Sequence, residues 1–141
     1  MSAKPRTIVV PKASQVLYDH YHFAPATRVG DTVWVSGQVG TDAKGRPGEG
    51  MAAQAELAFE SLKAVLAEAG ASLGDVVELT TFHIDLRGDM PAFAAVKDRY
   101  FPSHYPSWTA VGTTALAVDG LLVEVRAVAV VGSAAAQSDP G

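Results

Sequence analysis

The chain has 141 residues, of which 48% are hydrophobic and 18% charged, and its net charge at neutral pH is −4. It contains no cysteine, which excludes disulfides, thiolate catalysis and cysteine-based metal sites. The acidic balance, without any block of basic residues, argues against nucleic acid and anionic membranes as partners. No apolar run approaches the roughly 20 residues of a membrane span, and the first residues lack a signal-peptide pattern, so we expect a cytoplasmic protein.

The length corresponds to a single domain, which we place over residues 1–131, with a disordered polar tail over residues 132–141. The share of charged residues is low for a small monomer, whose surface is large relative to its core. We therefore expect part of the apolar surface to be buried against identical subunits.

Hydrophobic periodicity predicts the elements in chain order. Strands are predicted over residues 7–10, 32–39, 76–86, 109–116 and 121–131. Helices are predicted over residues 51–69 and 90–101, with Asp89 as the N-cap of the second. Residues 12–25 have no clear period and read as an ordered loop, residues 28–31 as a turn, and Asp119–Gly120 as a hairpin turn into the last strand. This order predicts an α+β domain of two layers, with the helices on one face of a sheet.

The last predicted strand carries charges on one face only. Glu124 and Arg126 share that face with apolar residues, while the opposite face is wholly apolar. One interpretation is a structural ion pair between the two charges. The other is a carboxylate that faces a cleft, where an apolar wall raises its pKa into the range of a useful acid or base.

Histidines offer a weak metal hypothesis. His20 and His22 would share a face in an extended segment, but a zinc site needs three or four ligands and no cysteine is present. We therefore expect no metal and no cofactor. Thr81, His83 and Asp85 share one face of their strand, which we expect to be polar and partly exposed.

Two further stretches admit both a structural and a functional interpretation. Gly37 lies in a small-residue strand end, either as a bulge or as a point where a ligand or backbone approaches closely. Trp108 follows Pro106 just before a β-branched strand, either as a core residue or as part of a binding surface.

In combination, five stretches resemble the RidA/YjgF family, the reactive enamine/imine deaminases, some of which carry an older label as L-PSP endoribonucleases. The stretches are VWVSGQVG at 33–40, AAQAELAFESLKAVLAEAGASLGDVVELTTFHID at 52–85, MPAFAAVKDRYF at 90–101, YPSWTAVG at 105–112 and VEVRAVAV at 123–130. The resemblance implies a chorismate-mutase-like fold, with a mixed sheet and two helices on one face. It also implies a homotrimer with three clefts between neighbouring subunits.

The resemblance carries the family's site over only in part. Gly37 matches the glycine of the strand end, and Glu124 matches the cleft glutamate that is thought to position the attacking water. Trp108 stands where the family has the arginine that binds the substrate carboxylate. Phe23 stands at the tyrosine of the early loop, and Ala110 at a cysteine.

Other residues near these positions complete the predicted site. Lys97 falls at an asparagine of the second helix, and Thr109 lies between Trp108 and Ala110. Either Lys97 or Arg126 is a candidate source of a displaced positive charge.

Three functions follow from this pattern. The first is hydrolysis of an imine or enamine that lacks the usual carboxylate, since a tryptophan does not replace a bidentate arginine. The second is a trimer that binds a small aromatic or amine metabolite without turnover. The third is a ribonuclease, which the acidic charge disfavours.

Overall fold

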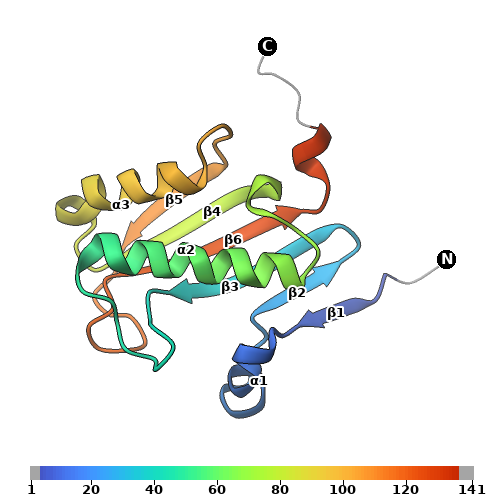
Figure 1. The fold of residues 1–141 in the computed structure, drawn as a ribbon, viewed down its shortest axis with the longest axis horizontal. Coiled ribbons are helices and arrows are strands. Elements are labelled where there is room, and N and C mark those ends of the chain that lie inside the picture. Colours follow the sequence, from blue (N-terminus) through green and yellow to red (C-terminus); the bar gives the residue numbers. More distant parts are fainter. Residues whose placement is uncertain (1–3, 137–141) are drawn as a thin grey trace.

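Six strands form one sheet in the order β1-β2-β3-β6-β4-β5 in the computed structural model, which describes residues 4–136 (Figure 1). The strands are β1 (Arg6–Val9), β2 (Ala26–Val29), β3 (Thr32–Val39), β4 (Val76–His83), β5 (Ser107–Gly112) and β6 (Val123–Val130). The helices are α1 (Gln15–Tyr21), α2 (Gly50–Glu68) and α3 (Leu86–Tyr100), with short 3-10 turns η1 (Lys12–Ser14), η2 (Leu73–Asp75) and η3 (Ser133–Ala136). Only β4 and β5 pair in parallel, and α3 is the crossover that such a pair requires.

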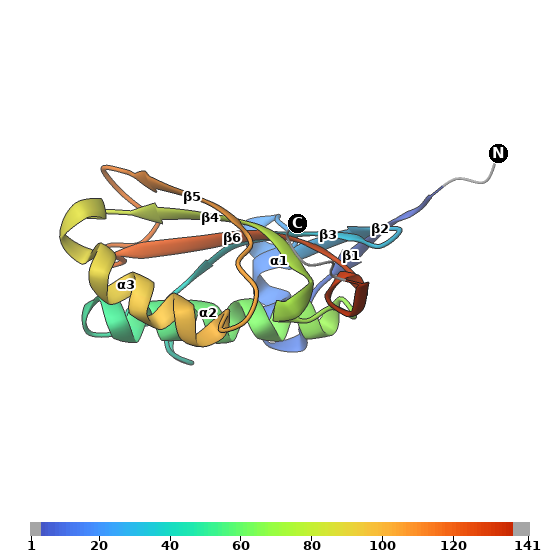
Figure 2. The same ribbon diagram turned by 90° about the horizontal axis from the view of Figure 1, so that it is seen from above.

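The predicted two-layer α+β arrangement is confirmed. Helices α2 and α3 lie on the same side of the sheet, as the edge-on view shows (Figure 2). On α2 the small side chains of Ala55 and Ala58 are fully buried and bring the helix close to the sheet. Phe59 of α2 is fully buried, and its ring centroid lies 5.7 Å from that of Phe93 on α3. The sheet thus has one covered face and one open face.

Strand β6 follows the alternation that its sequence predicts. Val123, Val125, Ala127 and Ala129 are all fully buried under the helices. The intervening side chains, from Glu124 onward, lie on the open face and are half-buried. Burial of every second residue fixes the register, because a slip by one residue would turn the apolar face to solvent.

The N-terminal part differs from the sequence prediction. The expected loop over residues 12–25 contains η1 and α1, and the expected turn over residues 28–31 overlaps β2. Helix α1 has seven residues and buries none of them, so it has no apolar stripe that periodicity could detect. Strand β2 has only four residues, and the turn that follows it is confined to Gly30 and Asp31.

Two predictions around the second helix and the last strands are wrong. The N-cap of α3 is Asp85, whose side chain accepts a hydrogen bond from the backbone N–H of Gly88, and Asp89 lies inside the helix. The expected hairpin between the last two strands does not form, because β6 inserts between β3 and β4. Local turn residues gave no information about that long-range pairing.

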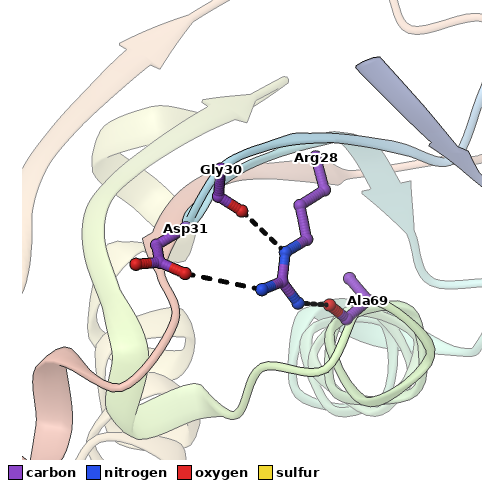
Figure 3. Close-up of polar contacts among 4 residues, drawn as sticks. All are labelled: Arg28, Gly30, Asp31 and Ala69. Carbon is purple, nitrogen blue, oxygen red and sulfur yellow. Dashed lines mark hydrogen bonds and ion pairs between the residues drawn. The ribbon is translucent and has the colours of Figure 1, made fainter. Parts of the chain in front are cut away.

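Arg28 joins the β2–β3 hairpin to the end of α2 (Figure 3). Its Nη1 donates to the carbonyl oxygen of Ala69 at 2.8 Å, and its Nε donates to the carbonyl oxygen of Gly30 at 2.9 Å. Its Nη2 lies 3.5 Å from Oδ1 of Asp31. A cation at this end of a helix satisfies a free carbonyl and interacts favourably with the helix dipole.

The polar tail is partly structured. Ser133–Ala136 form η3, and the backbone N–H of Ala134 donates to Oδ1 of Asp75 at 3.1 Å. The expected disorder from residue 132 therefore does not hold for this turn, while residues 137–141 lie outside the described part of the chain. Across residues 4–136, no helix combines the length and the apolar character that crossing a bilayer requires.

Candidate functional site

A bulge in β3 places Gly37 on the open face of the sheet. The pairing of β3 with β6 shifts register between Val35 and Gln38. The Gln38 side chain points toward the helices, where its Oε1 accepts a hydrogen bond from Ser61 of α2 at 2.5 Å. Its Nε2 donates to the carbonyl oxygen of Ser36 at 3.0 Å. These contacts hold the bulge against α2 and leave Gly37 facing away from the core.

The Glu124 carboxylate lies directly over this glycine. A Cβ atom at position 37 would stand 2.5 Å from both Cδ and Oε2 of Glu124, closer than real Cβ contacts come. Burial alone raises the pKa of the Glu124 carboxyl above its ordinary value. No ion pair joins Glu124 to Arg126 within residues 4–136, so the single chain does not support the structural ion-pair interpretation of this face. A partly desolvated carboxylate of this kind suits an acid or base.

Gln54 fixes the entry to β6 and is a residue that the sequence analysis missed. Its Oε1 accepts from the backbone N–H of Leu122 at 2.7 Å, two residues before Glu124. Its Nε2 donates to the carbonyl oxygens of Gly48 and Gly120 at 3.0 and 2.8 Å. The signal was present, since Gln54 interrupts the apolar face of its helix, and a buried amide needs partners.

Trp108 lies on the opposite, helix-covered side of the sheet. Its strand partner is Leu79, a fully buried residue, and its ring centroid is 5.9 Å from that of Phe93 on α3. Its indole Nε1 donates to Oγ1 of Thr81 at 3.0 Å. The core interpretation of this tryptophan is therefore correct in part, because Trp108 packs against the core but is only half-buried at the β5 edge.

A short polar relay continues from Trp108 into the core. Oγ1 of Thr81 lies 2.7 Å from Nε2 of His83, and both residues are fully buried. The expectation that this face is partly exposed is thus wrong for Thr81 and His83, because α3 covers them; Asp85, beyond the strand end, is exposed. The hydroxyl accepts the indole proton, and it can either donate to Nε2 or accept a second hydrogen bond from it, depending on the imidazole tautomer. Burial also lowers the pKa of His83.

Lys97 of α3 packs against the same tryptophan. Its Nζ lies 4.9 Å from the ring centroid of Trp108, within the range of a cation–π contact. The lysine side chain is only 8% exposed, and its ammonium lies 3.3 Å from Oδ1 of the exposed Asp98. Ala110, two residues along β5 from Trp108, faces the same side and pairs with Thr81.

The remaining predicted site residues belong to the open face or its edge. Arg126 and Thr109 lie in one cross-strand row on the open face, joined by Thr80. Thr109 therefore points away from its neighbour Trp108. Phe23 is exposed and follows α1, next to Ala24, whose carbonyl oxygen accepts from Oγ of Ser36 in the bulge at 2.6 Å.

The predicted site is thus divided into two groups within one chain. The Glu124 group consists of Glu124 and Gly37, with Arg126 and Thr109 on the same face and Phe23 in the segment that contacts the β3 bulge. The Trp108 group consists of Trp108, Ala110 and Lys97 on the helix side of the β5 edge. The sheet separates these groups, so a single copy does not bring them together.

Other candidate sites are not supported by the geometry. His20 lies in α1 and His22 is its left-handed C-cap, with φ of 60°, so they do not form the expected extended pair. Within the part of the chain that the structure describes, no three His, Asp or Glu side chains gather as metal ligands. A shallow depression of about 480 Å³ beside the start of α3 is lined by residues 84–87 and 112–114, and neither Glu124 nor Trp108 borders it.

Known proteins resemble this chain over most of its length. Residues 14–131 match the family model described as Endoribonuclease L-PSP. The RutC family protein YjgH of Escherichia coli strain K12 is 39% identical over 125 residues, which cover 88% of this chain and 94% of that protein. A Dermatophagoides farinae protein named 2-iminobutanoate/2-iminopropanoate deaminase is 33% identical over 135 residues, covering 93% and 99%.

A solved structure agrees with these sequence matches. The crystal structure of Rv2704 from Mycobacterium tuberculosis is described as a member of the YjgF/YER057c/UK114 family. It superposes with a TM-score of 0.79 at 31% identity and covers 90% of this chain and all of that one.

Proposed function

Because the chain belongs to the RidA/YjgF family, we propose that it hydrolyses a small imine or enamine in a cleft between the subunits of a homotrimer. The observation that carries this proposal is the Glu124 carboxylate, which lies over the bare backbone of Gly37 with a pKa raised by burial. The substrate lacks the usual carboxylate directly beside the imine carbon, because Trp108 stands at the position of the family arginine.

The proposed reaction needs one water and one proton relay. Water adds to the imine carbon to give a carbinolamine, and the C–N bond then breaks to release ammonia and a carbonyl compound. Glu124 accepts a proton of the attacking water as the C–O bond forms and delivers it to the imine nitrogen, and it then transfers the carbinolamine hydroxyl proton to the same nitrogen as the C–N bond breaks. An enamine first gains a proton at carbon and loses one from nitrogen to become the imine. A carboxylate with a raised pKa is the better base for the first step.

The open sheet face supports assembly of the site from two copies. Ile8 and Trp34 are about 40% exposed on this face, in one cross-strand row with Val128. A second copy that covers this row removes exposed apolar surface from water. It also offers a way to bring the Trp108 group of one subunit to the Glu124 group of another, which no single chain achieves.

The Trp108 substitution supports a changed substrate class. A desolvated charge-assisted contact, once removed, typically costs about 2–5 kcal/mol when its partner stays buried. That corresponds to roughly 30- to several-thousand-fold in affinity for a small 2-imino acid. The name of the Dermatophagoides farinae relative specifies such 2-imino acids for that protein, and at this position our chain offers an indole instead.

The test is ammonia release from freshly generated imines. Wild type should hydrolyse imines that lack a carboxylate on the imine carbon faster than 2-iminopropionate. Glu124→Gln should reduce the rate by about 100-fold or more, the usual contribution of acid–base catalysis, while the exposed Glu68→Gln on α2 should leave it unchanged. Efficient turnover of 2-iminopropionate would refute the substrate class. Ligand-dependent stabilisation without ammonia release from any imine would favour a non-catalytic binding protein.

A further inference from the structure

We infer that Lys97 makes the Trp108 side of the cleft a binding site for an anionic group, so that the ligand joins a flat apolar part to an anion. The inference rests on the proposed function, because that function gives this half-site a ligand. It locates the positive charge on a helix, whereas the family's charge comes from the strand residue at the position of Trp108.

The first argument is the burial of the lysine. An ammonium is costly to remove from water unless opposite charge or hydrogen-bond acceptors surround it. Here the Lys97 side chain is 8% exposed, and the face of the Trp108 ring supplies part of the compensation at 4.9 Å. Lysines are rarely buried to this extent without a full set of partners.

The second argument is the number of free donors. A lysine ammonium has three N–H groups. Among residues 4–136, Lys97 makes a single hydrogen bond, to Oδ1 of Asp98 at 3.3 Å, and that partner is the next residue on the same helix. Two donors of a nearly buried charge are therefore available to a ligand.

The third argument is access. Asp98 is 69% exposed, so the ammonium that contacts it lies at the boundary between the core and solvent. A ligand anion can approach Lys97 there, either beside Asp98 or in its place. Arg126, the other cation of the predicted site, does not compete, because it lies on the opposite face of the sheet.

The fourth argument is the fixed position of the tryptophan. The hydrogen bond from its indole N–H to Thr81 points the polar edge of the ring inward. Trp108 as a whole is half-buried, and its ring lies next to the ammonium. A ligand that touches both needs an anionic group attached to a flat apolar group, and a cationic ligand would meet the Lys97 charge.

The experiment measures binding of four probes of similar shape to the full chain by isothermal titration calorimetry. The probes are benzoate, phenyl phosphate, benzamide and benzylamine. Wild type should bind at least one of the two anions about tenfold or more tighter than benzamide, and benzylamine weakest. The stronger of the two anions identifies a carboxylate or a phosphate ligand, and either result supports the inference.

Variants assign the preference to the lysine. Lys97→Met keeps the length of the side chain without its charge and should abolish the anion preference, while leaving benzamide binding within about threefold. Lys63→Met removes an exposed lysine of α2 and should preserve the preference. If Lys97→Met does not fold, Lys97→Gln and the loss of anion affinity in wild type at 0.5 M salt provide the same information.

The inference is overturned if wild type binds benzoate and phenyl phosphate no better than benzamide, if it binds none of the probes, or if the preference survives in Lys97→Met. Its failure is distinct from that of the proposed function. An anion preference with no ammonia release refutes only the hydrolase, and hydrolysis of imines without an anion preference refutes only the Lys97 site.

Discussion

Replacing Gly37 with alanine tests the placement of the Glu124 carboxylate. The added methyl would stand 2.5 Å from Cδ and Oε2 of Glu124 and 2.8 Å from its Cγ. Carbon atoms are most stable about 3.5–4.0 Å apart, so the carboxylate must move by about 1 Å. Because Cγ is also too close, rotation of the carboxylate group alone does not relieve the contact.

The expected stability change is small and the expected activity change is large. An off-rotamer side chain costs about 0.5–1.5 kcal/mol, and overpacking typically costs about 1–3 kcal/mol. We therefore expect Gly37→Ala to lower the free energy of unfolding by about 1 kcal/mol, or about 4 °C in Tm for a chain of this length. A displacement of about 1 Å at a catalytic group costs about 100-fold in rate, and we expect that loss in ammonia release.

Thermal unfolding followed by circular dichroism measures the first effect, and a double-mutant cycle identifies its cause. In a Glu124→Ala background, Gly37→Ala should cost nothing, because the group it strikes is gone. Gly112→Ala in β5 is the matched control, since its added methyl comes no closer than 3.7 Å to its neighbours. A stability loss that persists in the Glu124→Ala background, or unchanged ammonia release in Gly37→Ala, would refute the reasoning.

Substitutions at three residues have defined outcomes in unfolding measurements. The folded-state pKa of Glu124 lies above its unfolded value of 4.5, so its contribution to stability falls as pH rises through the folded value. Glu124→Gln should therefore be more stable than wild type at pH 8. A gain in stability that persists at pH 3.5 would contradict this. The folded-state pKa of His83 lies below its unfolded value of 6.5, so stability should fall as pH decreases below 6.5, and His83→Gln should remove that part of the pH dependence. Arg28→Met should lower the free energy of unfolding by about 1–2 kcal/mol, because it leaves the Ala69 carbonyl without its donor, and Arg28→Lys should be intermediate. Equal stability of wild type and both Arg28 variants would argue against the helix-capping role.

The sequence predicted the elements whose periodicity is set by burial. Strand β6 alternates as expected because one face packs under α2 and α3, and that alternation singled out Glu124 as a charge on the less buried face. Helix α2 followed its apolar positions for the same reason. Residue types alone therefore located the carboxylate, while its contact with Gly37 required the β3 bulge, which has no local signature beyond small residues.

What the sequence did not predict depends on long-range packing. The insertion of β6 between β3 and β4 turned an expected hairpin into distant strands. It also left β5 at the edge of the sheet. There α3 covers the side that carries Trp108 of β5 and Thr81 of the neighbouring strand β4. The helix crossover decides which face of an edge strand is covered, and the sequence did not predict it. The sequence analysis therefore assigned Trp108 and Glu124 to one site, whereas they lie on opposite faces of the sheet.

Subunit mixing tests most directly whether the site spans two copies. Glu124→Gln and Trp108→Ala subunits, each inactive alone, would be co-expressed in equal amounts and assayed for ammonia release from the imine that wild type hydrolyses best. In randomly mixed trimers about a quarter of the sites combine an intact Glu124 group with an intact Trp108 group from the neighbour, so about a quarter of wild-type activity should return. Mixed trimers that form, as native mass spectrometry would show, but remain as inactive as their parents would contradict a shared site.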